Sequence, residues 1–489
     1  MAGSYLVLQF DFSGIDTQQR DTTYTGFLNK VQSGIRLCMG RYPELIPGQE
    51  ADLLLRQESP DGMLLAFLSS VARQPQKICL LIDEYDHFTN ELISFDLDYF
   101  QEIVSRNGWV RKFYEIVKQF TGLGTVDRIF MTGVSPVTLD SLTSGFNIGA
   151  NLTMDPGLHG LMGFSAEETE TLLLAAGIGP EQIEAVMTDV RRWYNGYAFS
   201  AEGQQPRMYN PDMVLYFAKE YQKRQGYPPQ MLDVNIASDY GKIRRTFQLG
   251  GQEPGRYELL RRILAGGSIA SPITAQFSFE RSFTDQDFLS LLYYLGLLTI
   301  RGAELGTPLL GPPNLVVEKL YFDYFSELME RQLSGLPRAL AVQDLVREMA
   351  IHNRPQPLLE LAASTLEQAS NRDLIHLNET GIKMILMSYL HAAQLYFLRS
   401  EREAVQGYVD LLLLRRPPVE TPCQFVFELK YLKRKDAGQL EQALETGRAQ
   451  LRRYFRDPEL QAEPNLRAWL AVFVGTELKA AEEVLPAEA

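Results

Sequence analysis

Two short stretches of the chain, Gly407-Tyr408-Val409-Asp410 and Phe427-Glu428-Leu429-Lys430, decide how its last third folds. Each lies in a continuous apolar run, which is typical of a buried β-strand. Residues two apart on a strand point to the same face, so Glu428 and Lys430 project together. Asp410 lies inside a nearly pure Leu and Val strand, where a carboxylate needs a cation or takes up a proton. If the two strands pair, two carboxylates and one ammonium group converge.

This combination of side chains suits the hydrolysis of phosphodiester bonds. Asp410 and Glu428 offer oxygen ligands of the kind that Mg²⁺ or Mn²⁺ prefers. A metal ion held there would lower the pKa of a bound water and neutralise charge on a phosphoryl oxygen. Lys430 would orient that water and stabilise the transition state. The alternative is an ordinary salt bridge at the mouth of the sheet. The buried Asp410, 18 residues before Glu428, and the helix that follows favour the catalytic interpretation.

The order of elements from residue 337 onward predicts a compact α/β domain. Helices, including one over 381–397, precede the two strands, and a helix over 439–455 follows them. An apolar stretch at 468–474 gives one more strand. We therefore expect a C-terminal α/β domain over 337–480, followed by a flexible acidic tail over 481–489.

The N-terminal part of the chain alternates strands with helices. Its strands are continuous apolar runs, which indicates parallel strands covered on both faces. They are expected at 5–10, 78–82 and 128–132. In such a sheet, ligands bind beyond the carboxyl ends of the strands. The polar residues at those ends are Asp11, Asp83, Glu84, Thr132 and Ser135. We expect this domain to cover 1–162. A mostly helical middle region over 163–336 follows, in which Ser165 and Glu168 have the spacing of a helix-capping box.

The composition of the whole chain excludes several classes of protein. It has 489 residues, of which 45% are hydrophobic and 22% charged, as in a globular chain of about three domains. Its formal net charge of −14 excludes a polycation that coats nucleic acid or acidic membrane. Three cysteines far apart exclude a zinc ribbon and a disulfide framework and favour a reducing compartment. The longest apolar run, 288–300, is shorter than the roughly 20 residues that span a bilayer, and the N-terminus does not resemble a signal peptide. We therefore expect a cytoplasmic protein without a membrane partner.

The two C-terminal stretches together resemble the PD-(D/E)XK nuclease superfamily. More specifically, nearly the whole chain is similar to bacterial proteins that join an AAA-ATPase-like domain to a C-terminal PD-(D/E)XK nuclease domain. The segments that carry this wider resemblance are 10–14, 81–86, 131–135, 194–199 and 209–211. The resemblance implies a restriction-endonuclease-like α/β fold for the C-terminal domain. It also implies a parallel-sheet, P-loop-type ATPase-like fold for the N-terminal domain.

The resemblance further implies the residues of a nuclease site. Asp410 and Glu428 would ligate the metal ion, and Lys430 would be the catalytic lysine. Glu379, at the start of the preceding helix, would be the extra acidic residue that such folds often place near the metal. The superfamily's variable fourth position would fall on Gln442 or Gln450.

The same resemblance gives the N-terminal sheet edge a nucleotide-binding role. Asp83 and Glu84 follow apolar residues as in a Walker B motif, in which Asp83 would hold Mg²⁺ and Glu84 would polarise the attacking water. Thr132, like Ser135, falls where such ATPases place a γ-phosphate sensor. The chain contains no G-x-x-x-x-G-K-[ST] motif. We therefore expect ATP to bind only if a P-loop lies upstream of Met1, and this domain otherwise to be a scaffold that lacks its P-loop.

The expected partner is a nucleic acid, with DNA favoured over RNA, and homo-oligomerisation stays open. Between residues 399 and 457 the chain has 12 Lys and Arg against 9 Asp and Glu, a local positive charge that suits phosphate binding. The leading hypothesis is a Mg²⁺-dependent nuclease domain carried on an ATPase-like scaffold. The alternative is a non-catalytic module that binds nucleic acid or protein through degenerate ATPase and nuclease sites. A third possibility, an active ATPase, requires the upstream P-loop.

Overall fold

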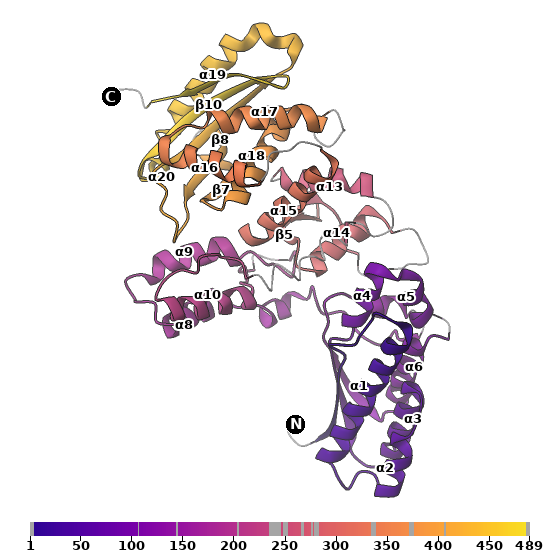
Figure 1. The fold of residues 1–489 in the computed structure, drawn as a ribbon. Helices are drawn as coiled ribbons and strands as arrows, with labels where there is room; N and C mark the ends of the chain where they lie inside the picture. The colour runs from indigo at the N-terminus through magenta and orange to yellow at the C-terminus, as the bar shows by residue number, and fades with distance from the viewer. Residues whose placement is uncertain are drawn as a thin grey trace.

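The computed structural model describes residues 4–105, 107–142, 145–202, 205–233, 246–247, 253–265, 268–274, 277, 283–333, 339–370, 376–404 and 407–485. The chain forms an N-terminal α/β domain, a mainly helical middle region and a C-terminal α/β domain (Figure 1). This architecture confirms the fold class predicted from the sequence. In the part of the chain that the structure describes, no helix is long and apolar enough to cross a membrane.

The N-terminal domain is built on a three-stranded parallel sheet with the order β1-β2-β3. The strands are β1 (Tyr5–Asp11), β2 (Lys77–Asp83) and β3 (Val126–Met131). The register pairs Asp11 with Asp83, so both residues lie at the carboxyl edge of the sheet. These strands lie close to the positions that the apolar runs predicted.

One face of this sheet is covered by helices and the other is partly exposed. The helices of the domain are α1 (Arg20–Arg41), α2 (Gly48–Leu55), α3 (Pro60–Val71), α4 (His87–Phe95), α5 (Leu97–Val104), α6 (Trp109–Gly122) and α7 (Val137–Ser141). Along β1, Leu6, Leu8 and Phe10 are buried, whereas Gln9 is exposed. On β3, Phe130 is half exposed. In the described residues the expectation of two covered faces is therefore wrong, because an apolar run does not reveal which face has a partner.

The middle region combines helices with a small antiparallel sheet. Its helices are η2 (Pro156–Leu161), α8 (Ala166–Ala175), α9 (Ile183–Tyr194), α10 (Pro211–Arg224), α13 (Glu253–Leu264), α14 (Asp285–Tyr294) and α15 (Leu315–Gln332). Its sheet has the order β4-β6-β5, with β4 (Ile269–Ala270), β5 (Thr299–Glu304) and β6 (Thr307–Gly311). The predicted capping box is present, because the Ser165 side chain accepts from the Glu168 N–H and the Glu168 carboxylate accepts from the Ser165 N–H. The sheet was not predicted, since its strands are short and contain glycine and proline.

The C-terminal domain holds a five-stranded mixed sheet with the order β11-β10-β9-β8-β7. Its strands are β7 (Tyr396–Ala404), β8 (Gly407–Arg415), β9 (Gln424–Leu432), β10 (Leu466–Val474) and β11 (Glu477–Glu483). Its helices are α16 (Ala339–His352), α17 (Gln356–Ser370), α18 (Glu379–Ala393), η4 (Arg434–Gln439), α19 (Leu440–Tyr454) and α20 (Pro458–Gln461). β9 and β10 are parallel and joined through α19, whereas the other neighbouring strands are antiparallel.

Two elements of this domain differ from the sequence prediction. The helix expected over 381–397 ends at Gln394, whose φ of 53° is left-handed, and β7 begins two residues later. β11 extends to Glu483, into the segment expected to be a flexible tail over 481–489. Residues 486–489 of that segment lie outside the described residues.

The buried apolar residues form two clusters. One cluster belongs mainly to the N-terminal domain, with Phe277 and Leu291 added from the middle region. The other runs without interruption from the middle region into the C-terminal sheet. The middle region therefore shares its main core with the C-terminal domain, while the N-terminal domain has a core of its own.

Candidate active site

The pairing of β8 with β9 brings Asp410 beside Glu428. Leu411 lies opposite Phe427 in the antiparallel register, so Asp410 and Glu428 adjoin that pair. The Oδ2 atom of Asp410 accepts a hydrogen bond from the backbone N–H of Leu429, with an N···O distance of 2.7 Å. This bond ties the Asp410 side chain to β9, so two predicted site residues from separate strands lie next to each other.

Glu428 is the centre of the side-chain cluster and is only 1% exposed. Lys430 Nζ lies 2.5 Å from Glu428 Oε1. The Tyr454 hydroxyl donates to the other oxygen, Glu428 Oε2, at 3.1 Å. A buried carboxylate with a cation on one oxygen and a hydroxyl on the other is held in one orientation.

Burial and the negative charge of Asp410 both raise the pKa of Glu428. Burial raises the pKa of Glu428 to about 7, and the nearby carboxylate of Asp410 adds to the shift, while Lys430 and Tyr454 oppose it. Burial acts to lower the pKa of Lys430, but its hydrogen bond to Glu428 and the charges of Glu428, Asp410 and Glu379 outweigh burial, so the net shift is upward. Lys430 therefore stays an ammonium group at neutral pH, and its carboxylate neighbours leave an excess of negative charge.

Glu379 belongs to the same group of charges. It is the first residue of α18, a helix that packs against β9 and whose N-terminus is capped by the Asn378 side chain. Its charge contributes to the raised pKa of Lys430, which places its carboxylate near that ammonium. The fold thus brings Asp410, Glu428 and Lys430 together, and the charge of Glu379 acts on the same lysine.

The helix after β9 contributes a residue that the sequence interpretation missed. Tyr454, not Gln442 or Gln450, makes the hydrogen bond from α19 to Glu428. Gln442 is exposed. Gln450 lies one turn before Tyr454, and its Oε1 atom is buried and accepts no hydrogen bond from a described residue. A signal was present in the sequence, because Tyr454 continues the apolar face of the helix that also carries Leu451.

The donor set of this cluster fits a divalent cation. The two adjacent carboxylates of Asp410 and Glu428, with the charge of Glu379 acting on the same lysine, are hard oxygen donors, which Mg²⁺ and Mn²⁺ prefer. A cation between Asp410 and Glu428 would also relieve the repulsion that raises the pKa of Glu428. Among the described residues, no group of three or more His, Cys, Asp or Glu side chains is close enough to form a metal site by itself. Asp410 and Glu428 are the two carboxylates that would hold such an ion.

At the edge of the N-terminal sheet, Asp83 and Thr132 lie together. The Thr132 hydroxyl donates to Asp83 Oδ1, as does the backbone N–H of Glu84. Glu84 adopts a left-handed φ of 53°, and burial raises the pKa of its carboxyl. Ser135 is buried, and its hydroxyl donates to Asn90 Oδ1. The edge thus groups the predicted Asp83, Glu84 and Thr132, whereas the Ser135 hydroxyl is used within the fold.

Asp86 in this region was not singled out from the sequence. It is fully buried, and its carboxylate accepts from the backbone N–H groups of Val134 and Ser135 and from the Asn90 amide. These bonds join the loop after β2 to the loop after β3. Asp86 therefore serves folding, since every hydrogen bond that its carboxylate accepts from the described residues comes from the backbone or from Asn90.

Comparison with known proteins finds one family match near each end of the chain. Residues 1–143 match a family model described as predicted AAA-ATPase, and residues 377–483 match a model of the PD-(D/E)XK nuclease superfamily. The chain therefore joins an AAA-ATPase-like domain to a PD-(D/E)XK nuclease superfamily domain, as the sequence resemblance indicated. No curated protein matches the chain. Asp410, Glu428, Lys430, Glu379 and Tyr454 all fall within the second match.

Proposed function

We propose that the C-terminal domain is a divalent-metal-dependent nuclease that hydrolyses phosphodiester bonds in nucleic acid, with DNA favoured over RNA. The observation that carries the proposal is the buried Glu428 carboxylate, held between Lys430 and Tyr454 and facing the like charge of Asp410. A protein rarely buries a carboxylate beside a second carboxylate for stability alone. Membership of the PD-(D/E)XK nuclease superfamily supports the same reaction.

In this proposal each side chain has a separate task. Asp410 and Glu428 hold the Mg²⁺ or Mn²⁺ ion, and Glu379 supplies further negative charge. The bound ion would supply an acidified water and neutralise charge on the phosphate. Lys430 keeps its proton and donates hydrogen bonds to the phosphate oxygens, on which negative charge develops in the transition state. Tyr454 holds Glu428 in position.

The surface around the site supports a nucleic-acid substrate. Lys433, Arg434 and Lys435 follow β9 and are exposed. Arg452, Arg453 and Arg456, at and just beyond the end of α19, are also exposed. Arg448 is different, because it forms a two-pronged ion pair with Glu482 on β11, at 2.5 and 2.9 Å. We therefore propose the first two groups, and not Arg448, as phosphate contacts.

For the N-terminal domain we propose ATP binding where a P-loop accompanies it, and a scaffold role otherwise. Asp83, Glu84 and Thr132 would serve ATP hydrolysis only in a chain that supplies a P-loop before β1, because the phosphate cradle and its lysine provide much of the binding contact. The sequence contains no Walker A motif.

Cleavage assays with matched variants test the nuclease proposal. Single-stranded and double-stranded DNA and RNA are incubated with the full chain in Mg²⁺, in Mn²⁺ and in a chelator. We expect metal-dependent cleavage that falls about 100-fold or more in Asp410→Asn and in Lys430→Gln. Glu441→Gln, which changes an exposed acid on α19, is the control and should cut normally. Binding of nucleic acid without cleavage, or equal cleavage by all three variants, would favour the non-catalytic module instead.

A further inference from the structure

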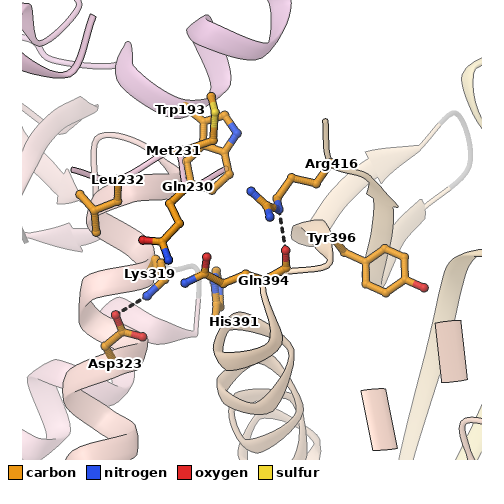
Figure 2. A pocket seen from close by; sticks show the side chains of 10 residues that line it. All are labelled: Trp193, Gln230, Met231, Leu232, Lys319, Asp323, His391, Gln394, Tyr396 and Arg416. Atoms are coloured by element: carbon orange, nitrogen blue, oxygen red, sulfur yellow. Dashed lines mark hydrogen bonds and ion pairs between the residues drawn. The ribbon is translucent and has the colours of Figure 1, made fainter. Parts of the chain in front are cut away.

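A cavity lies where the middle region meets the C-terminal domain, away from the β8–β9 cluster. Its volume is about 160 Å³. Its walls come from α9, α15 and α18, from the loop around Met231, and from the ends of β7 and β8 (Figures 1 and 2). None of its lining residues belongs to the candidate active site. Such a volume is below that of a drug-sized site, so the cavity suits a small group.

The first feature of this cavity is a buried arginine without a counter-ion. Arg416 is 4% exposed, and no described carboxylate forms an ion pair with it. Its Nε donates to the backbone oxygen of Gln394 at 2.6 Å, at the C-terminus of α18. A guanidinium group has five N–H donors, so its two Nη groups are left for the cavity. Burial lowers the pKa of Arg416. An uncompensated buried cation is unfavourable, and an anion in the cavity would relieve it.

Two further polar atoms in the cavity wall are buried without a partner. The indole Nε1 of Trp193 and the imidazole Nε2 of His391 make no hydrogen bond with a described residue. Both side chains are at least nine-tenths buried. Figure 2 shows the indole nitrogen on the side of the Trp193 ring that faces Arg416. Buried N–H groups are normally satisfied, so the Trp193 donor in particular points to an acceptor that enters the cavity.

The charge of the cavity is positive in sum. Lys319 lies across from Arg416 and pairs with Asp323 at 2.5 Å, so two cations face one carboxylate (Figure 2). The amides of Gln230 and Gln394 add further donors to the wall. The donors of Trp193, Lys319 and Arg416 approach from α9, from α15 and from the end of β8. A tetrahedral oxyanion accepts hydrogen bonds in several directions at once, whereas a planar carboxylate satisfies fewer of them.

We propose that this cavity binds a phosphate group, with Arg416 and Trp193 as its main donors. The phosphate comes either free in solution or as the terminal group of a mononucleotide, whose nucleoside would extend outward. The site joins α9 and α15 of the middle region to the end of β8, so a bound phosphate ties the two regions together. This binding is independent of the nuclease reaction.

Titration of the full chain tests the proposal. Sodium phosphate is added at constant ionic strength, and tryptophan fluorescence and the melting temperature are recorded, with acetate as the planar control anion. We expect a saturable change with phosphate and none with acetate. A parallel titration with adenosine monophosphate distinguishes the sources, because tighter binding of the nucleotide identifies the terminal phosphate and weaker binding identifies the free ion. Absence of saturable binding by both overturns the proposal.

Variants locate the binding in the cavity. Arg416→Gln should weaken phosphate binding at least tenfold. Trp193→Phe keeps an aromatic ring and should abolish the fluorescence change and reduce the phosphate-dependent rise in melting temperature several-fold. Arg36→Gln removes an exposed arginine from α1 and should behave as the wild type. If Arg416→Gln fails to fold, Lys319→Gln replaces it with the same expectation. Equal phosphate affinity in the cavity variants and in Arg36→Gln overturns the proposal.

Discussion

At the scale of single residues, the orientation of Glu428 depends on a side chain that lies 26 positions later in the chain. The Tyr454 hydroxyl bonds to Glu428 Oε2 and thereby opposes the rise of the Glu428 pKa. Metal ligands must be deprotonated, so this hydroxyl helps to keep Glu428 available near neutral pH. The hydrogen bond connects the packing of α19 to the chemistry of β9.

Tyr454→Phe tests this connection. Loss of the hydroxyl should raise the pKa of Glu428 further, so a higher pH is needed to ionise it. We expect cleavage to fall about tenfold at pH 7, roughly the effect of one hydrogen bond to a charged group, and to recover as the pH rises. The measurement is the pH–rate profile.

The matched control for Tyr454→Phe is Tyr389→Phe. It removes a buried hydroxyl from the same domain, where Tyr389 shares a hydrogen bond with Thr365. This control should alter stability without moving the pH–rate profile. Superimposable profiles for Tyr454→Phe and the wild type would show that the hydroxyl does not act on Glu428.

His391 should make the fold sensitive to acid. Burial lowers the pKa of His391 to about 3, and the charge of Lys319 adds to the shift. An unfolded histidine takes up its proton near pH 6.5, so between about pH 6.5 and 3 the unfolded state binds a proton that the folded state does not. As the pH is lowered through the middle of this window, His391 should therefore decrease the free energy of unfolding by about 1.4 kcal/mol per pH unit.

His391→Phe keeps a ring to stack on Phe322, which lies 4.6 Å from His391 between ring centroids. Urea unfolding at several pH values between 4 and 7 should show a shallower decline for this variant than for the wild type. Parallel declines in the two proteins would mean that His391 is accessible to protons in the folded state. The comparison uses the slope, so a constant change in stability does not affect it.

Most of the candidate site could be predicted because its signals are local. Asp410 is conspicuous as an acid in an apolar strand, and Glu428 and Lys430 share a face by simple alternation. Glu379 came from the family resemblance. Tyr454 was missed because its hydrogen bond depends on how α19 crosses the sheet, which no local spacing encodes.

At the scale of elements, α1 lies against β1 with little space between them. A Cβ added at Gly34 would meet the backbone oxygen of Gln9 at 2.5 Å and the Phe10 ring at the same distance. Gly34 is therefore a contact that lets the helix approach the strand. Gly40 on the same helix has nothing within 4 Å of such a Cβ.

The pair Gly34→Ala and Gly40→Ala isolates this contact. Both substitutions improve helix propensity equally in principle. Gly34→Ala should lower the free energy of unfolding by about 1–3 kcal/mol, because backbone must move. Gly40→Ala should be neutral or slightly stabilising. Chemical denaturation measures both, and a stable Gly34→Ala variant would mean that α1 can shift away from β1 without loss.

Helices and strands were predicted correctly where the hydrophobic pattern is long and regular. The prediction failed where a single residue ends an element. The parallel strands of the N-terminal domain and the strands β8, β9 and β10 are long apolar runs. The sequence predicts a helix at the start of β7 because the break occurs at Gln394, a residue type with no special preference for the left-handed φ that it adopts. It predicts a tail at β11 because this acidic and alanine-rich strand gains its partner only beside β10.

At the scale of the whole molecule, the arrangement of the cores predicts two unfolding units. The N-terminal domain has its own apolar cluster, and the middle region shares the other with the C-terminal domain. The extent of each core could not be predicted from the sequence. A hydrophobic pattern shows which face of a helix or strand is buried, but not which other element that face packs against. Calorimetry of the full chain should accordingly show two transitions.

Single substitutions should move these transitions separately. Gly34→Ala should lower the melting temperature of the first unit by several degrees. Gly447→Val should lower that of the second, because a Cβ at Gly447 would lie 2.3 Å from the buried Leu470 Cδ1. One transition that both variants shift equally would show that the regions unfold together.

Metal binding tests the proposed nuclease site most directly. Mn²⁺ is titrated calorimetrically into the chain in an Asp83→Asn background, so that the N-terminal sheet edge contributes no ion. We expect one site whose Kd rises at least tenfold when Asp410→Asn is added and stays unchanged when Glu441→Gln is added. The same Kd in all three proteins, or no binding in any of them, would contradict a metal ion held between Asp410 and Glu428.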